Sequence, residues 1–223
     1  SIPFCFITNT TTQSAAQLQH KLLSLDIPCR QEQLISAPVA TAQYLRREGL
    51  DRCFFAVEPS VLEDFAGIEA TEDHPQAVVV GDIGERWSYA LLDRIFHCLL
   101  SGARLVAMHR NKYWQTSAGL HIDIGAFVAG LEYVADTTAV ITGKPSGAFF
   151  AAALAVLGIA RDHALLVGDD VLSDIAGAQA AGIRGTLVQT GKYRAELVAK
   201  SGITPDLLLP SVADLPSRLA LLI

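Results

Sequence analysis

The sequence predicts an α/β protein built on parallel strands, in which a second α/β module is inserted between the early and late strands of a compact domain. Short apolar runs alternate with segments of helical periodicity along all 223 residues. Apolar residues make up 51% of the chain and charged residues only 18%, which indicates a well-buried core. An acidic cluster follows one late strand and has no counterpart in the middle of the chain, so the middle is interpreted as the inserted module.

The first elements are a strand and a helix joined by a polar loop. The strand is expected at residues 4–7, an apolar run that ends at the threonine-rich segment 8–12. Threonine hydroxyls in such a loop suit a helix N-cap. Apolar residues from Ala15 to Leu25 then recur at helical spacing, which predicts a helix.

The remaining elements continue the alternation. Later strands are short apolar runs, expected at residues 53–57, 77–80, 105–108, 139–142, 164–167 and 186–189. Helices carry apolar residues at helical spacing and are expected at residues 39–48, 88–101, 127–135, 146–157, 175–181 and 212–222. Pro145 favours the start of one of these helices, and Gly182 is suited to end another.

Composition restricts the classes of partner. A net charge of −6 and a pI near 5.4 argue against nucleic acid or an anionic membrane, and an anionic substrate would need cations inside its site. The longest apolar run, residues 148–160, is far shorter than the ~20 residues of a membrane span, and no secretory signal pattern opens the chain. The four cysteines have neither zinc nor redox-pair spacing, so we expect reduced, buried, inert thiols and a cytoplasmic location.

The most informative segment is the acidic cluster after the strand at 164–167. Asp169, Asp170 and Asp174 lie just past the end of this strand, where open parallel sheets bind ligands. Like charges this close repel one another unless a cation or hydrogen-bond donors offset them, and hard oxygen ligands suggest magnesium. Asp169 is best placed as a metal ligand, Asp170 is a second candidate, and Asp174 could orient Lys144 or a metal-bound water. Helix capping is the alternative for Asp170 and Asp174.

Two further polar loops follow predicted strands. Thr8, Asn9 and Thr10 follow the first strand, where a hydroxyl and exposed backbone N–H groups can bind phosphate oxygens. An ordinary helix cap is the alternative for this loop. Lys144 follows the strand at 139–142 and offers an ammonium to a phosphate or a carboxylate, whereas a solvated surface lysine is the alternative.

The ordered set of these loops resembles the haloacid dehalogenase (HAD) superfamily of phosphatases. The segment Phe6–Asn9 matches the second motif of the family, Lys144 the third, and Asp169, Asp170 and Asp174 the fourth. The resemblance covers almost the whole chain and is closest to the branch with a large α/β cap between the second and third motifs.

The resemblance implies both a fold and a chemistry. The core would be a doubly wound, Rossmann-type sheet formed by residues 1–37 and 137–223, with the α/β cap at residues 38–136. The reaction would be hydrolysis of a phosphate ester through an aspartyl-phosphate, with Mg²⁺ as the cofactor. Lys144 and Asp174 would belong to the catalytic set. Dimerisation through the cap would also fit the family.

The first motif of the family, D-x-D, is where this chain departs from the pattern. The family uses its first aspartate as the nucleophile and its second as the general acid/base, but no two aspartates among the 223 residues are separated by one residue. The missing strand would lie in the middle of the sheet, where its loss leaves backbone groups unpaired. We therefore expect a strand–helix segment of roughly 30 residues upstream of Ser1, and an inactive chain without it. A protein that has lost the nucleophile, or a partner that supplies the strand, is the alternative.

A basic and aromatic segment, His109 to Trp114, lies in the predicted cap. By resemblance it would close over the phosphate site and select the leaving group. A solvated loop whose aromatic residues cover the core of the cap is the alternative. Asp123, which precedes a predicted helix, is a weak candidate for substrate contact.

Two functions from different classes remain in view. The leading one is a magnesium-dependent phosphatase that acts on a small phosphorylated metabolite, on pyrophosphate or on phosphoamino groups. In it Thr8, Asn9, Thr10 and Lys144 would bind the phosphoryl group. The alternative is a non-catalytic phosphate-binding or interaction protein. A dinucleotide-binding domain is disfavoured because no G-x-G-x-x-G follows a strand.

Overall fold

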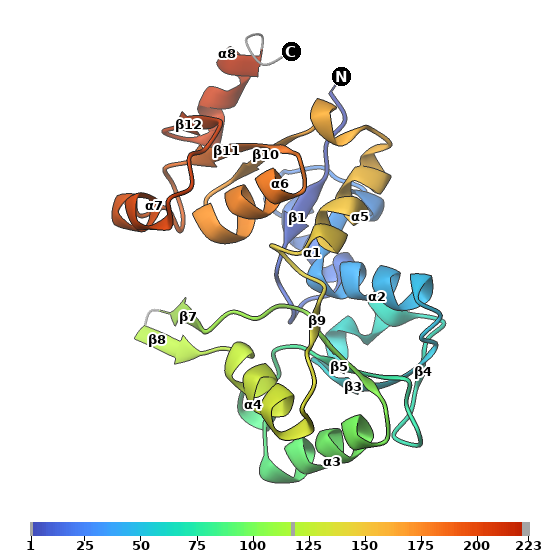
Figure 1. Ribbon diagram of the computed structural model, residues 1–223. Coiled ribbons are helices and arrows are strands. Elements are labelled where there is room, and N and C mark those ends of the chain that lie inside the picture. Colours follow the sequence, from blue (N-terminus) through green and yellow to red (C-terminus); the bar gives the residue numbers. More distant parts are fainter. Residues whose placement is uncertain (1, 117–118, 220–223) are drawn as a thin grey trace. The chain divides into compact units, whose positions relative to one another are not determined.

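The computed structural model describes residues 2–116 and 119–219 (Figure 1). It divides into two compact units, Ser1–Gly143 and Lys144–Ile223. Each unit combines parallel strands with helices, so the predicted α/β class is confirmed. Among the described residues, no helix has both the length and the apolar character required to cross a membrane.

The first unit is organised around a five-stranded parallel sheet with strand order β4-β3-β5-β6-β9. Its strands are β3 (Arg52–Ala56), β4 (Glu69–Ala70), β5 (Ala77–Val80), β6 (Arg104–Ala107) and β9 (Val140–Ile141). The four residues of β5 are fully buried, as expected for a central strand whose two faces are both covered.

Helices cover both faces of this sheet. They are α2 (Ala37–Arg47), α3 (Tyr89–Leu100) and α4 (Gly125–Ala135), with 3₁₀ turns at Pro59–Phe65 (η2) and Gly84–Arg86 (η3). Leu45 of α2 and Phe65 of η2 pack in one core cluster with Val79. Alternate residues of the same strand, such as Val78, pack on the other face against Ile95 of α3 and Leu131 of α4. Two layers of buried side chains therefore hold the sheet.

A second, two-stranded parallel sheet in the first unit joins β1 (Phe6–Thr8) to β2 (Leu34–Ser36). Between these strands lie α1 (Ala15–Leu23) and the 3₁₀ turn Gln31–Gln33 (η1). Helix α1 begins with a capping box, in which Ser14 accepts from the Gln17 N–H and the Gln17 side chain accepts from the Ser14 N–H. The N-cap of α1 is therefore Ser14 and not the threonine loop after β1.

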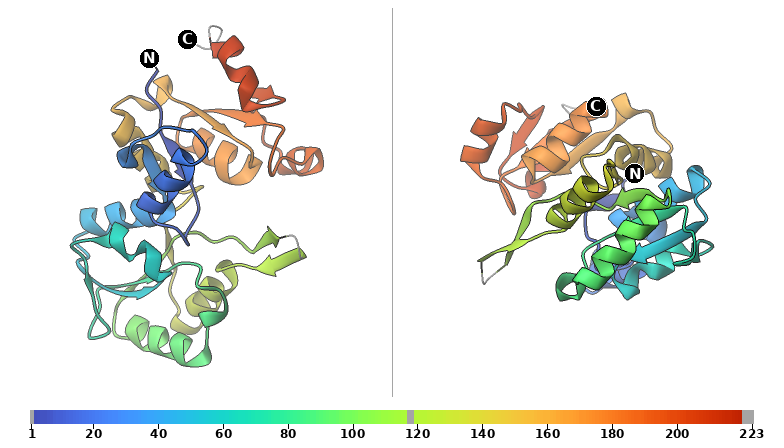
Figure 2. Two further views of the ribbon diagram at one scale, coloured as in Figure 1. Left: turned by 180° about the vertical axis from the view of Figure 1, so that it is seen from behind. Right: turned by 60° about the horizontal axis from the view of Figure 1, so that its bottom comes forward.

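An antiparallel hairpin completes the first unit. Its strands are β7 (Tyr113–Thr116) and β8 (Gly119–Ile122), with Tyr113 opposite Ile122 and Trp114 opposite His121. Figure 2 shows the hairpin projecting beyond the five-stranded sheet and its helices in both views. The segment from His109 to Trp114 was expected to form a loop, and the structure places its last two residues, Tyr113 and Trp114, in strand β7.

The second unit contains a three-stranded parallel sheet. Its strands β10 (Leu165–Gly168), β11 (Arg184–Val188) and β12 (Leu207–Leu209) lie in sequence order. The helical elements are α5 (Gly147–Leu157), η4 (Arg161–His163), η5 (Val171–Ala176), α6 (Gly177–Ala180), α7 (Ala195–Ser201), η6 (Val212–Asp214) and α8 (Leu215–Leu219). The helix expected at 175–181 begins earlier, as a turn of π-helix that leads into α6. Of the helix expected at 212–222, residues 220–222 lie outside the described part.

The boundary between core and cap stays a prediction. Residues 1–37, 38–136 and 137–143 all lie in the first unit, and residues 144–223 form the second. Strand β9, which was assigned to the core by its sequence, pairs with β6 in the five-stranded sheet, with Val140 opposite Val106.

Candidate functional site

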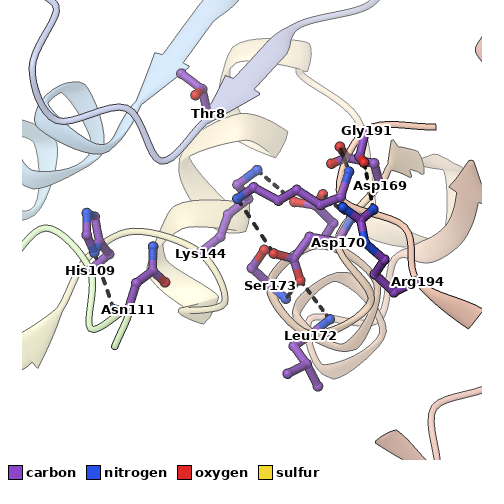
Figure 3. Close-up of polar contacts among 12 residues, drawn as sticks. Thr8, His109, Asn111, Lys144, Asp169, Asp170, Leu172, Ser173, Gly191 and Arg194 are labelled. Carbon is purple, nitrogen blue, oxygen red and sulfur yellow. Dashed lines mark hydrogen bonds and ion pairs between the residues drawn. The ribbon is translucent and has the colours of Figure 1, made fainter. Parts of the chain in front are cut away.

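The acidic cluster lies at the carboxyl end of β10, in the second unit (Figure 3). The strand ends at Gly168, where a Cβ would lie 2.5 Å from Oδ2 of Asp174. Only glycine therefore allows this side chain to fold back against the end of the strand. Asp170 is the N-cap of η5, because its Oδ1 accepts hydrogen bonds of 3.0 Å from the N–H groups of Leu172 and Ser173.

Lys144 and Asp174 form a close ion pair. The Lys144 Nζ donates to Asp174 Oδ1 at 2.7 Å, and the two side chains are 11% and 7% exposed. The other oxygen of Asp174 accepts the Asp170 N–H at 3.2 Å. The carboxylate is thus held between the lysine and the turn that carries the rest of the cluster, and the lysine is no freely solvated surface residue.

Close backbone packing brings the Lys144 segment to this turn. Pro145 packs against the Cα of Gly177, where a Cβ would lie 2.8 Å from the Pro145 Cβ and 2.7 Å from the Phe150 ring. The helix that follows, α5, is capped by Ser146, which accepts from the Phe149 N–H. Glycine at the start of α6 and proline before α5 therefore act together to place Lys144.

The third carboxylate, Asp169, meets a turn that follows β11. Its Oδ2 accepts the Lys192 N–H at 2.8 Å, and the Lys192 Nζ lies 3.8 Å from Asp170 Oδ2. Burial raises the pKa of Asp170, but hydrogen bonds from Ser173 and Leu172 and the charge of Lys192 outweigh burial, and the pKa lies below its usual value. Asp170 is therefore ionised at neutral pH.

The threonine loop after β1 lies in the first unit. The Thr8 Oγ1 accepts the Thr10 N–H at 3.1 Å and forms a hydrogen bond of 2.8 Å with the Thr10 hydroxyl. Asn9 lies beside Gly143, where a Cβ would be 2.9 Å from Asn9 Oδ1 and 2.1 Å from the Met108 carbonyl oxygen. The loop therefore packs against the residue that precedes Lys144 in the chain.

The base of the β7–β8 hairpin contains a buried pair. His109 and Asp123 are 4% and 6% exposed, with 3.9 Å between His109 Nε2 and Asp123 Oδ1. Asp123 also accepts the Ile124 N–H at 2.7 Å, and His109 Nδ1 accepts the Asn111 N–H at 3.3 Å. Because Asp123 is buried, its contacts favour a structural role at the base of the hairpin and not the substrate contact suggested by the sequence. Tyr113 and Trp114, by contrast, are 59% and 49% exposed, so they do not cover a core.

Comparison with known proteins decides the family. The profile described as haloacid dehalogenase-like hydrolase matches residues 1–70, and the one described as HAD-hydrolase-like matches residues 141–215. The human (Homo sapiens) haloacid dehalogenase-like hydrolase domain-containing protein 2 is 38% identical over 195 residues, which are 87% of this chain and 74% of that protein. The chain belongs to the haloacid dehalogenase-like hydrolase family. The predicted resemblance is confirmed.

Further HAD relatives are named for phosphatase activity. The phospholysine phosphohistidine inorganic pyrophosphate phosphatase of Mus musculus is 34% identical over 191 residues, 85% of this chain and 70% of that protein. The p-nitrophenyl phosphatase of Archaeoglobus fulgidus matches with a TM-score of 0.91 and 25% identity, over 96% of this chain and 85% of that one. A thermostable NPPase of Geobacillus stearothermophilus matches with a TM-score of 0.87 and 28% identity, over 95% and 85%. The chain is a HAD enzyme of the phosphatase group.

The donor atoms of the second unit fit part of a magnesium site. Asp169 and Asp170 provide hard carboxylate oxygens on adjacent residues, and magnesium is usually bound through one or two carboxylates together with waters and substrate phosphates. Residues 2–116 and 119–219 gather no group of three or more His, Cys, Asp or Glu side chains that could hold a metal.

One part of this site was not singled out from the sequence. Gly191 and Lys192 lie outside the motifs that carry the HAD resemblance, yet they contact Asp169 directly. The available signal was a glycine followed by a cation just past a predicted strand. The pairing with a carboxylate about twenty residues earlier could come only from the fold.

Proposed function

We propose that this HAD enzyme is a magnesium-dependent phosphatase that acts through an aspartyl-phosphate intermediate, with the nucleophile on a segment upstream of Ser1. The observation that supports it most is the buried Lys144–Asp174 pair beside Asp169 and Asp170 at the end of β10. A cation and a group of carboxylates at the carboxyl end of a parallel strand suit a phosphate–metal site.

Each residue then has a defined role. The Lys144 Nζ binds a phosphoryl oxygen while Asp174 Oδ1 holds it in place at 2.7 Å. Asp169, with Asp170 as the second candidate, would hold Mg²⁺, which when bound supplies positive charge to the phosphoryl oxygens. Thr8, Asn9 and Thr10 would bind phosphate oxygens through hydroxyl and backbone N–H groups.

The substrate would be a small phosphate monoester, pyrophosphate or a phosphoamino compound. The relative named for phospholysine, phosphohistidine and inorganic pyrophosphate favours the last two classes.

A homodimer through residues 38–136 stays a prediction. So does a cytoplasmic location, which rests on four free cysteines whose positions range from half-buried to buried. Burial raises the pKa of the Cys53 thiol to about 11, and the charge of Asp51 adds to this, so that thiol is inert at neutral pH.

The alternative of a non-catalytic phosphate-binding protein is favoured by one observation, the lack of a D-x-D pair among the 223 residues.

The full-length gene product should be assayed with p-nitrophenyl phosphate, pyrophosphate and phospholysine, with and without Mg²⁺. We expect turnover that requires Mg²⁺ and falls at least about 100-fold in Asp169→Ala and in Lys144→Ala. Lys200→Ala, an exposed substitution on α7, is the control.

The results separate the two functions. Phosphate binding without turnover of any of these substrates would favour the alternative. Unchanged turnover in Asp169→Ala would contradict the assignment of the metal site.

A further inference from the structure

The turn after β11 is braced by its own side chains. The Tyr193 N–H donates to the Thr190 carbonyl at 3.2 Å, and the Gln189 side chain donates to the Tyr193 hydroxyl at 3.2 Å. Arg194 Nη1 donates to the carbonyl oxygens of Gly191 and Tyr193 at 3.2 and 2.7 Å. These contacts fix the backbone of residues 190–194, which we call the 190–194 turn.

This turn approaches Asp169 as closely as a backbone can. Gly191 has φ +59°, and a Cβ there would lie 1.9 Å from Asp169 Oδ2. The carboxylate oxygen lies where that side chain would be, and it accepts the N–H of the next residue, Lys192, at 2.8 Å. A side chain at position 191 would displace either the turn or the carboxylate, so the glycine is required by this approach as well as by its backbone conformation.

We infer that the 190–194 turn is a positioning element for the metal ligand Asp169, a role that rests on the proposed function. The Lys192 N–H occupies Oδ2 and fixes the orientation of the carboxylate, while among residues 144–219 no donor binds Oδ1. Asp169 is thereby presented as a one-oxygen ligand. Such a ligand suits the small octahedral shell of Mg²⁺, whereas larger cations such as Ca²⁺ readily take both oxygens of a carboxylate.

Lys192 also acts on the neighbouring carboxylate, that of Asp170, through its side chain. The Lys192 ammonium is 72% exposed and lies 3.8 Å from Asp170 Oδ2, which makes it a weak, screened partner. Backbone and side chain of Lys192 thus have separable effects. The N–H orients Asp169 and should strengthen metal binding, whereas the ammonium repels a cation and should weaken it slightly.

Three variants of the full-length protein separate these effects. Lys192→Pro removes the N–H and the ammonium, Lys192→Ala removes only the ammonium, and Gly191→Ala places a methyl group against Asp169. Affinity for Mn²⁺ and Mg²⁺ is measured by calorimetry without substrate, and circular dichroism reports the fold. We expect Lys192→Pro and Gly191→Ala to weaken binding about 10- to 100-fold, the range found for groups that orient metal ligands. Lys192→Ala should bind the metal as tightly as the wild type or slightly more tightly.

A purely structural role of the turn predicts a different outcome. It would lower thermal stability in Lys192→Pro and Gly191→Ala but leave the metal affinity of the folded protein unchanged, and that result would overturn the inference. Equal weakening in Lys192→Ala and Lys192→Pro would also overturn it, because the ammonium would then be responsible. If wild type and Asp169→Ala both fail to bind metal, the proposed function fails as well. If Gly191→Ala folds and Lys192→Pro does not, the first variant decides alone.

Discussion

At the scale of single residues, each carboxylate of the acidic cluster has its own partner. Asp170 caps η5, Asp174 holds Lys144, and Asp169 accepts a backbone N–H from the 190–194 turn. Hydrogen bonds and the ammonium groups of Lys144 and Lys192 therefore offset the mutual repulsion of three like charges. The capping alternative for Asp170 describes the contacts of its Oδ1, whereas its Oδ2 lies 3.8 Å from the Lys192 ammonium.

The close approach of Asp174 to Gly168 gives a first prediction. In Gly168→Ala the added Cβ would lie 2.5 Å from Asp174 Oδ2 in a buried place, so the Lys144–Asp174 pair must shift. We expect a loss of about 1–3 kcal/mol in the free energy of unfolding, measured in urea, and a fall in turnover. Gly147→Ala is the control, because nothing lies within 4 Å of its Cβ position. Equal stability of the two variants would contradict this contact.

A second residue-scale prediction concerns Asp64 of η2, whose carboxylate accepts a hydrogen bond from Ala15 at the start of α1. Burial raises the pKa of Asp64 to about 6, although the Ala15 N–H, donating at 3.2 Å, opposes the shift. A raised folded pKa means that the folded state favours the protonated form, so this contribution is full below about pH 4 and is lost as pH rises through about 6. Asp64→Asn should therefore gain about 1–2 kcal/mol of unfolding free energy relative to wild type between pH 4 and pH 7, after allowance for solvent screening. The exposed Glu85→Gln, whose carboxylate has no part in the Asp64 shift, is the control, and a pH-independent difference would refute the shift.

At the scale of elements, strongly apolar segments could be predicted and weakly apolar ones could not. Strand β5 has the predicted limits because a short run of four apolar residues, three of them valine, is typical of a buried strand. Strand β2 has only two apolar residues, and the hairpin is exposed on both faces, so neither shows the alternation typical of half-buried strands. The same holds for the site. Lys144 and the three aspartates are visible as motifs, whereas Gly191 gains its meaning only from a carboxylate brought to it by the fold.

The base of the hairpin gives a prediction for an element. Gly125, the first residue of α4, donates its N–H to the Asn111 carbonyl at 3.0 Å, and a Cβ there would lie 2.3 Å from that same oxygen. Because the obstacle is backbone, no side-chain motion can relieve it. Gly125→Ala should therefore lower Tm by several degrees, from a cost of about 1–3 kcal/mol.

Helix α4 supplies its own control for this variant. Gly130 is exposed and has nothing within 4 Å of its Cβ position, so Gly130→Ala should stabilise the helix by up to about 1 kcal/mol. The same substitution at two positions of one helix is thus expected to change Tm in opposite directions: Gly125→Ala lowers Tm and Gly130→Ala raises it. A rise in Tm in both variants would contradict the prediction, because the backbone at the base of the hairpin would then move to accommodate the added methyl group.

At the scale of the whole molecule, the proposed function requires a chain of net charge −6 to bind both a metal and an anionic substrate. The overall charge attracts any cation, so salt screening and specific binding both change stability. Specific binding of the metal depends on Asp169, whereas salt screening does not. A ligand that binds only the folded state stabilises it by about 2.7 kcal/mol at a concentration 100 times its Kd, which raises the Tm of a protein of this size by roughly 5–10 °C.

Thermal unfolding of the full-length protein in Mg²⁺, compared with NaCl at equal ionic strength, isolates the specific part. We expect the rise in Tm with Mg²⁺ to exceed that with NaCl, to be reversed by EDTA and to vanish in Asp169→Ala. The Lys200→Ala variant keeps the acidic cluster and should retain the full rise. A rise that is equal in both salts, or that survives in Asp169→Ala, would mean that magnesium acts on the charge of the molecule as a whole and not at the end of β10.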